Sequence, residues 1–295
     1  MRNFIPSKGL YLLVLKTIET MYRGFKLNID ESTFCQLTNF VPSFKDFISN
    51  KNTFYDVCLQ TGDEILNKTE VHHNIKKYVI GESGVINGTK LQNDWFPQIN
   101  CDVFISHSHR DEKVAIALAG WLYKTFGLTS FIDSCIWGYA NDLLKDIDNE
   151  YCRNNNRSYN YNRRNYSTSH VHMMLNMALM QMIDKTECLF FLNTPNSICL
   201  DDIETSTLSP WIYSEIGISQ IIEKTLKRKR TFTRRTTDSS IRESIEVPDF
   251  KYKLNLEHLA VIKHSHLINW AKCNKKETDA LDYLYNHISP APKKE

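Results

Sequence analysis

The chain has 295 residues, of which 42% are hydrophobic and 24% charged, a balance that is normal for a folded globular protein. Its formal net charge of +2 creates no global field toward nucleic acid or anionic lipid, so we expect neither as a partner. The six-residue apolar run from Leu10 to Leu15 is too short to span a bilayer and lacks a signal-peptide cleavage site. Eight scattered cysteines without a C-x-x-C pair favour reduced thiols, so we expect a cytoplasmic protein.

Residues 1–98 are predicted to form a small, mostly helical accessory domain. An apolar series with helical period ends near Gly24, and a second series runs from Phe34 to Ile48. Three glycines and a proline between Gly81 and Pro97 favour a loop, which we interpret as a domain junction. The second domain is then predicted to comprise residues 99–295.

The second section opens with the pattern of a parallel α/β fold. Val103-Phe104-Ile105 is a continuous apolar run, typical of a strand that is buried on both faces of a sheet. Apolar residues then recur with helical period from Val114 to Thr125, and Gly127 ends that helix. A second strand follows at Thr129–Asp133. Strand, crossover helix and strand in this order predict a doubly wound sheet.

The segment after the second strand is predicted to be a loop at 134–139 and a helix over Leu143–Tyr151. Residues 153–166 are rich in Asn, Arg and Tyr and have no apolar face, so we predict a mobile polar insertion. Basic residues interleaved with aromatic ones can bind RNA. A solvated loop is the favoured interpretation.

A helix from His170 to Asp184 is predicted next, capped by Ser167–Ser169. It contains five of the seven methionines, which usually fill a core, so we expect it to be buried or at an interface. Cys188–Asn193 has the apolar character of a third buried strand.

The C-terminal third contains a basic loop near 224–240, which we interpret as solvated surface. Strand-like segments follow at Phe250–Leu254 and Leu259–Ile262. The last apolar positions, from Ala280 to Ile288, predict a closing helix.

The stretch Ser209–Ile216 carries a candidate site. Ser209 is a good N-cap and Pro210 suits the first helical position, so a helix is predicted to begin there. Trp211 and Glu215 then lie four residues apart on one face. A carboxylate beside an aromatic ring can bind a flat ring and stabilise a developing positive charge. Alternatively, Trp211 belongs to the core and Glu215 only favours the helix dipole.

Four segments occur in the order found in Toll/interleukin-1 receptor (TIR) domains: Asp102–His107, Gly127–Asp133, Cys188–Asn193 and Trp211-x-x-x-Glu215. Over about residues 100–288, the chain resembles the bacterial TIR proteins of antiphage defence, including Thoeris-type systems, and the NAD-cleaving TIR enzymes of animals and plants. The resemblance implies a flavodoxin-like fold, with a five-stranded parallel sheet covered by helices on both faces.

The resemblance also implies roles for particular residues. The glutamate of the Trp-x-x-x-Glu motif is catalytic in the enzymatic members, and this role falls on Glu215. Residues 134–141 resemble the family's BB loop, which covers the nucleotide and contacts a neighbouring protomer. NAD is then a substrate and not a cofactor. A homo-oligomer formed through TIR contacts is implied, and so is a downstream effector that responds to the nucleotide product.

Several residues are candidates for contacting the nucleotide. Ligands of open α/β sheets bind beyond the carboxyl ends of the strands, where we expect Ser106, His107 and Asp133. Trp211 and Trp137 are aromatic candidates, although Trp137 equally suits an interface and His107 equally suits a structural role. We expect no metal, because the histidine pairs 107/109 and 170/172 lack a third ligand at a fixed spacing.

The predicted function is cleavage of the nicotinamide–ribose bond of NAD⁺ in immune or antiphage signalling, giving ADP-ribose or a cyclic ADP-ribose signal. A non-enzymatic TIR adaptor that acts by homotypic assembly is one alternative. An enzyme that transfers glycosyl groups of nucleosides or nucleotides is another.

Overall fold

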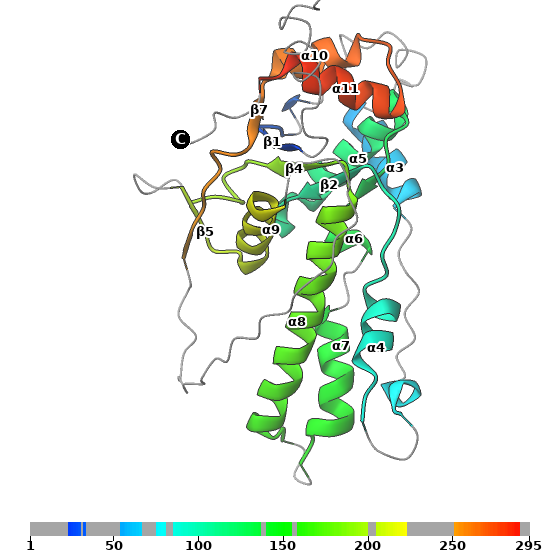
Figure 1. Cartoon of the computed structure of the whole chain (residues 1–295), viewed down its shortest axis with the longest axis vertical. Coiled ribbons are helices and arrows are strands. Elements are labelled where there is room, and N and C mark those ends of the chain that lie inside the picture. The colour runs from blue at the N-terminus through cyan, green and yellow to red at the C-terminus, as the bar shows by residue number, and fades with distance from the viewer. Residues whose placement is uncertain are drawn as a thin grey trace, which may run out of the picture.

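A five-stranded parallel sheet lies at the centre of the computed structural model, in the strand order β3-β2-β4-β1-β7 (Figure 1). Its strands are β1 (Arg23–Leu27), β2 (Val103–Ser106), β3 (Ser130–Phe131), β4 (Cys188–Leu192) and β7 (Ala260–Ile262). The structure describes residues 23–30, 32–33, 54–66, 75–80, 85–136, 140–154, 158–199, 205–222 and 251–289. The predicted α/β class with a five-stranded parallel sheet is confirmed, and the arrangement is compatible with a flavodoxin-like fold.

Strands β2 and β4 are neighbours near the middle of the sheet. Every residue of β2 and β4 is buried, as expected for strands covered on both faces. Their register pairs Val103 with Cys188 and Ser106 with Phe191. The three strands predicted from apolar runs in the second section are therefore confirmed, with β3 shorter than expected.

Strand β1 differs from the expected accessory domain. It lies between β4 and β7, with Leu27 paired to Leu192 on one side and to Ile262 on the other. Its side chains alternate, because Phe25 and Leu27 are buried whereas Lys26 between them is only partly buried. The first section of the chain therefore supplies an inner strand of the sheet.

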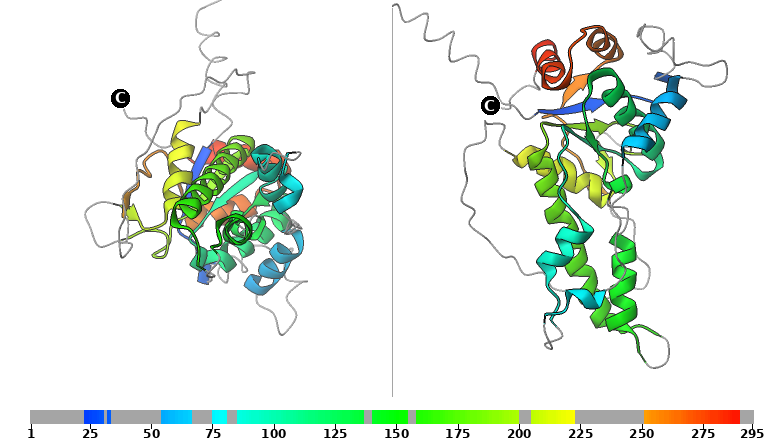
Figure 2. Two further views of the ribbon diagram at one scale, coloured as in Figure 1. Left: turned by 90° about the horizontal axis from the view of Figure 1, so that it is seen from below. Right: turned by 90° about the vertical axis from the view of Figure 1, so that its right-hand side faces the viewer.

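Helices cover both faces of this sheet (Figures 1 and 2). On one face, the Trp270 ring of α10 stacks on Phe126 at 4.2 Å and meets Trp121 edge-on at 5.7 Å. On the other face, α8 and α9 pack against each other beneath the strands. The covering helices are α5 (Glu112–Phe126), α8 (Tyr161–Lys185), α9 (Pro210–Ile221), α10 (His264–Ala271) and α11 (Glu277–His287). The predicted helices at α5, α9 and α11 are confirmed, and Gly127 ends α5 in the left-handed conformation.

Helix α3 (Phe54–Ile65) packs on α5 at unusually short range. A Cβ atom at Gly120 would overlap the carbonyl oxygen of Cys58, and one at Gly62 would overlap the carbonyl oxygen of Ile116. Each helix thus presents a glycine to the backbone of the other. The helical character predicted for the first section holds for this segment, which is fixed to the sheet-covering layer.

A helical arm extends away from the sheet (Figure 1, and the right panel of Figure 2). We use this name for α4 (Gly88–Trp95), α7 (Ala140–Ile147), the π-helical turn η6 (Asp148–Cys152) and the first half of α8. The loop predicted between Gly81 and Pro97 is wrong for α4, because the Asn87 side chain caps this helix by accepting from the Lys90 amide at 2.9 Å. Before α4, η4 (Ile75–Tyr78) forms a short 3₁₀ turn.

The start of α8 corrects the predicted polar insertion at 153–166. The helix begins at Tyr161, where Asn160 accepts from the Arg163 amide at 3.0 Å, and not at the expected Ser167–Ser169 cap. Arg164 and Ser167 both bind the Asp148 carboxylate, at 2.8 and 2.9 Å. Residues 161–166 have no apolar face of their own. They are helical because they make polar contacts with η6 and continue into a packed helix.

The remaining predicted strands divide between two places. Lys253 of β6 (Tyr252–Lys253) pairs with Ser206 of β5 (Ser206–Thr207) in a separate antiparallel ribbon, whereas β7 joins the main sheet as expected. The basic loop at 224–240 lies outside the described residues.

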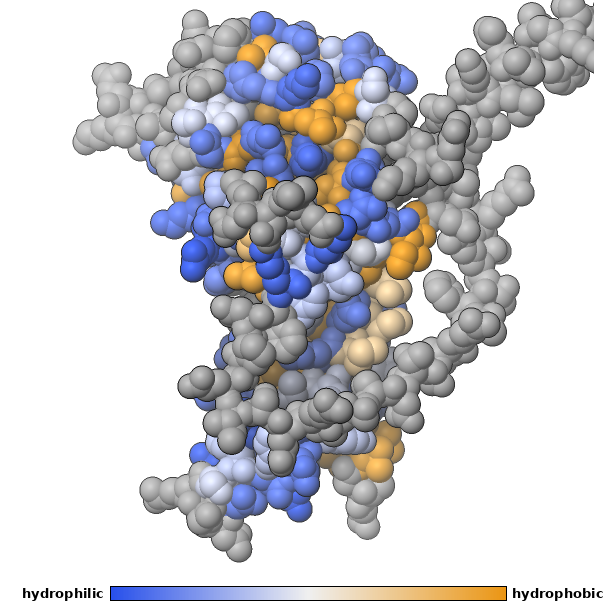
Figure 3. All heavy atoms as spheres, turned by 90° about the vertical axis from the view of Figure 1, so that its left-hand side faces the viewer, coloured by the Kyte–Doolittle hydropathy of each residue, from blue (hydrophilic) through white to orange (hydrophobic). Residues whose placement is uncertain are grey.

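The surface carries apolar side chains in separate patches. On the face beside α9 and β5, apolar and hydrophilic residues are interspersed (Figure 3). Met173, Met177 and Met180 of α8 are exposed by 59, 42 and 38%, whereas Met182 is buried, so the methionine helix is only partly core. Among the described helices, none combines the length and the hydropathy that crossing a bilayer requires.

Candidate active site

Helix α9 positions the candidate glutamate. Ser209 accepts from the Ile212 amide at 3.3 Å and Pro210 occupies the first turn, so the predicted helix start is confirmed. Glu215 lies one turn further on, and its side chain is only 2% exposed. Burial of an acid at this depth is costly unless it is hydrogen-bonded or neutral.

Ser106 is the hydrogen-bond partner of Glu215. Its hydroxyl donates to Oε2 at 2.6 Å, across 109 residues of sequence. Ser106 is the last residue of β2, so the sheet edge delivers this donor to α9. Asp133, the first residue of α6 (Asp133–Ile136), is close enough to affect the same carboxyl group. Three residues predicted separately from sequence are thus brought together.

The surroundings of Glu215 favour its neutral form. Burial raises the pKa of the Glu215 carboxyl well above its ordinary value, and the negative charge of Asp133 raises this pKa further. The hydrogen bond from Ser106 acts in the opposite direction but is the weakest of the three effects. A buried acid beside a second carboxyl group is an arrangement that active sites use to set protonation.

His107 lies beside this cluster. Its side chain is 8% exposed, and Nε2 is 3.3 Å from the Ser134 hydroxyl. Its Nδ1 is buried and has no hydrogen-bond partner in the part of the chain that the structure describes. Buried polar atoms usually have partners, so Nδ1 is an available contact for a ligand at the carboxyl edge of β2.

Trp211 contacts helix α8. Its ring meets the His172 ring at 5.6 Å and 87°, and one turn along, the Ser214 hydroxyl donates to Asn176 Oδ1. Burial lowers the pKa of His172, which favours the neutral imidazole. Trp211 therefore helps to seat α9 on α8, which accounts for its half-buried position.

The segment predicted to cover the nucleotide is described only in part. Residues 133–136 form α6, so its beginning is helical and not a loop. Trp137 lies outside the described residues.

A second polar cluster lies at the same sheet edge. Asp111, 7% exposed, accepts from the Thr194 hydroxyl and from Asn196 Nδ2, and Asn193 Nδ2 donates to Asn28 Oδ1 at 2.7 Å. A cavity of about 440 Å³ is lined by this cluster. The alternation of apolar and polar residues from Phe25 to Asp30 was the available signal that Asn28 follows a strand.

Within the described ranges, no group of three or more His, Cys, Asp or Glu side chains is arranged to hold a metal ion. Comparison of the chain with protein-family models, with curated proteins and with solved structures gave no match.

Proposed function

We propose that this chain is a TIR-type enzyme that cleaves the bond between nicotinamide and ribose in NAD⁺, with Glu215 as the catalytic residue. The observation that carries the proposal is the buried Glu215 carboxyl, 2% exposed and hydrogen-bonded by Ser106 at the carboxyl edge of a parallel sheet. Ligands of open α/β sheets bind at this edge. The order of the TIR-like segments along the chain supports the same assignment.

The chemistry requires one carboxylate. Nicotinamide leaves NAD⁺ with the bonding electron pair and becomes neutral, so its departure needs no general acid. The positive charge then develops on the ribose C1′, where the Glu215 carboxylate stabilises it or bonds to it. Water that adds at C1′ and loses a proton gives ADP-ribose, whereas attack by an adenine nitrogen gives a cyclic product.

Substrate binding accounts for the ionisation of Glu215. In the unbound protein, burial and Asp133 favour the neutral acid. The positively charged pyridinium ring of NAD⁺ has the opposite effect, because a nearby opposite charge favours the carboxylate. In this mechanism Glu215 releases its proton to water when the positively charged pyridinium ring of NAD⁺ binds beside it.

The described arrangement corresponds to a closed site. Glu215 is 2% exposed, and it does not line the cavities of about 790, 440 and 420 Å³ described for this part of the chain. Substrate entry therefore requires displacement of the groups around α6 and the end of β2. We propose that assembly of TIR-like protomers stabilises the open state of the site. In the proposed signalling role, the nucleotide product then acts on a downstream effector.

Release of nicotinamide from NAD⁺ by the purified full chain tests the proposal. We expect Glu215→Gln to reduce turnover by about 10²–10³-fold, as for the loss of a preorganised electrostatic group. Glu257→Gln makes the same change at an exposed position that is distant in sequence from Glu215. This matched control should retain wild-type turnover. Oligomeric state and far-UV circular dichroism are recorded for each variant.

The outcomes separate the alternatives. Wild-type turnover by a folded, assembled Glu215→Gln variant contradicts the assignment. An assembled wild-type chain that cleaves neither NAD⁺ nor nucleosides supports the adaptor alternative. Cleavage of nucleosides but not of NAD⁺ identifies the glycosyl-transferring alternative.

A further inference from the structure

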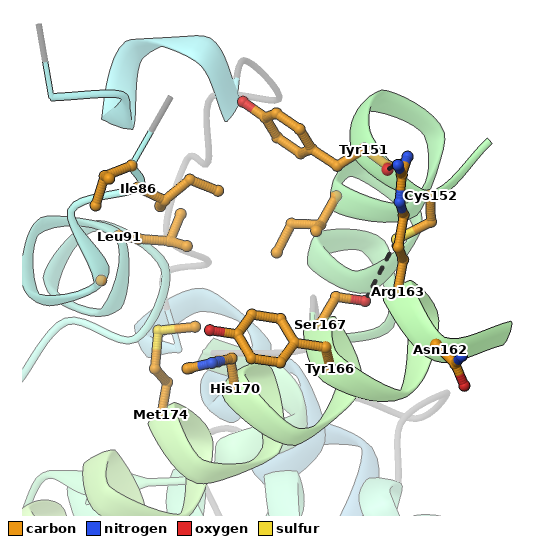
Figure 4. A pocket seen from close by; sticks show the side chains of 13 residues that line it. Ile86, Leu91, Tyr151, Cys152, Asn162, Arg163, Tyr166, Ser167, His170 and Met174 are labelled. Carbon is orange, nitrogen blue, oxygen red and sulfur yellow. Dashed lines mark hydrogen bonds between the residues drawn. The ribbon is translucent and has the colours of Figure 1, made fainter. Parts of the chain in front are cut away.

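A cavity of about 790 Å³ lies within the helical arm, between α4, η6 and the first half of α8 (Figure 4). Neither Glu215, Ser106 nor Asp133 lines it, so it is separate from the candidate active site. Its volume is in the range of pockets that hold small organic ligands.

The walls of this cavity are mainly apolar. Ile86 and Leu91, on the α4 side, face the tyrosine rings of η6 and α8 across the open space (Figure 4). The Tyr166 ring lies at one side with the His170 ring against it, at 4.4 Å between centroids. Water in such a space has few hydrogen-bonding partners, so an apolar molecule displaces it favourably.

The residues that line the cavity carry permanent charge of one sign. Arg163 is the permanent charge among the lining residues, and its Nη1 donates to the Tyr151 carbonyl oxygen at 3.2 Å. None of the described lining residues is acidic. The nearby Asp148 is already bound by Arg164 and Ser167. A ligand with one negative group therefore meets a complementary charge at the Arg163 side.

We propose that this cavity binds a small amphiphile that has an apolar body and one carboxylate, namely a medium-chain fatty acid. The chain lies against Leu91 and Tyr166, and the carboxylate faces Arg163. The proposal concerns binding alone and is independent of any activity at Glu215.

The cavity lies next to the part of α8 that contacts α9. Tyr166 and Met174 line the cavity, while His172 and Asn176 of the same helix contact α9. A bound fatty acid would therefore touch the helix on which the Glu215 helix is seated.

Titration calorimetry of the full chain tests the proposal, with decanoate, decanol and decylamine as probes below their aggregation concentrations. We expect saturable binding of one decanoate per chain, weaker binding of decanol and none of decylamine. Tyr166→Ala should weaken decanoate binding by about tenfold or more, because it removes one wall. Tyr161→Ala, also exposed on α8 but outside the cavity, should change it by less than about twofold.

Two further variants test the space in the cavity and the charge at its wall separately. Val85→Trp places a large ring at a lining position that is 56% exposed, and it should block decanoate without disturbing the core. Arg163→Gln should remove the preference for decanoate over decanol. The proposal is overturned if decanoate shows no saturable binding, if Tyr161→Ala weakens binding as much as Tyr166→Ala, or if decylamine binds as well as decanoate.

Discussion

The sheet edge around Glu215 and the helical arm are built in opposite ways. At the sheet edge, Ser106, Asp133 and Glu215 come from distant parts of the sequence and meet because strands and a helix end at one place. In the arm, α4 packs on α8 from a distant part of the sequence, but polar contacts such as that of Asp148 with Arg164 join segments close in sequence. The first region depends on a buried apolar framework and the second on caps and polar contacts. They should therefore respond differently to the same kind of substitution.

The largest contrast is expected from adding one methyl group to a helical glycine, first in the helical layer that covers the sheet and then in the arm. Gly120→Ala pushes a Cβ atom into the backbone of α3, and neither helix can yield without moving the layer over the sheet. We expect a loss of about 3 kcal/mol in the free energy of unfolding. Gly88→Ala, in α4 of the arm, meets nothing within 4 Å and should be neutral or stabilising by about 0.4–1 kcal/mol.

Thermal and urea unfolding of both glycine variants measure this difference. A loss of about 3 kcal/mol corresponds to a melting temperature lowered by roughly 6–12 °C in a chain of this size. Equal effects of the two substitutions would show that the sheet region is not the more tightly packed one.

A smaller effect, on the proposed NAD⁺-cleaving activity, is expected when the hydroxyl group of Ser106 is removed. Ser106→Ala removes the donor that lowers the pKa of Glu215, so this pKa rises further and less of the carboxylate is present at neutral pH. We expect kcat/KM for NAD⁺ to fall about tenfold at pH 7, with the rising limb of the pH profile displaced to higher pH.

The pH profile distinguishes a positioning role of Ser106 from a purely structural one. Ser106→Thr keeps a hydroxyl group and should restore most of the activity. A loss that is the same at every pH would contradict the link between Ser106 and the ionisation of Glu215.

The smallest effect is expected from Glu215→Gln on the free energy of unfolding. Between the ordinary Glu pKa of about 4.5 and the raised folded-state pKa, the folded chain holds a proton that the unfolded chain has lost. The free energy of unfolding contributed by Glu215 is therefore fully present below the ordinary value and decreases as the pH rises to the folded-state value. Gln carries no charge and still accepts from Ser106.

Thermal unfolding as a function of pH measures this contribution. We expect Glu215→Gln to melt a few degrees above the wild type at neutral pH and to match it under acidic conditions below the ordinary Glu pKa. A difference that does not depend on pH would contradict the raised pKa of Glu215.

Sequence reasoning worked best where the chain is apolar. Val103–Ile105 and Cys188–Leu192 are uninterrupted apolar runs, which only burial on both faces of a sheet satisfies, and both are strands. The helix start at Ser209-Pro210 was equally accessible, because its capping chemistry is local. The strand ends were enough to predict that Ser106 and Asp133 lie at one edge of the sheet, whereas the place of Glu215 there came from the family resemblance.

The sequence-based predictions were wrong for segments whose structure depends on contacts with residues outside the segment. Residues 161–166 have no apolar face, yet they are helical because Asn160 caps them and Asp148 binds Arg164. Strand β1 was missed for a related reason. Its five residues alternate only briefly, and nothing local indicates that the vacant position between β4 and β7 belongs to it.

By itself, the sequence determined the buried strands, the polar residues at their carboxyl ends and the capped start of α9. Apolar runs and helix caps act over only a few residues, so a local pattern is enough to predict them. Only the tertiary structure decided that β1 completes the sheet, that the polar stretch before Ser167 continues α8, and that Glu215 is buried beside Asp133. Those outcomes depend on pairing, charge and burial between segments that are brought together by folding, and no local pattern encodes them.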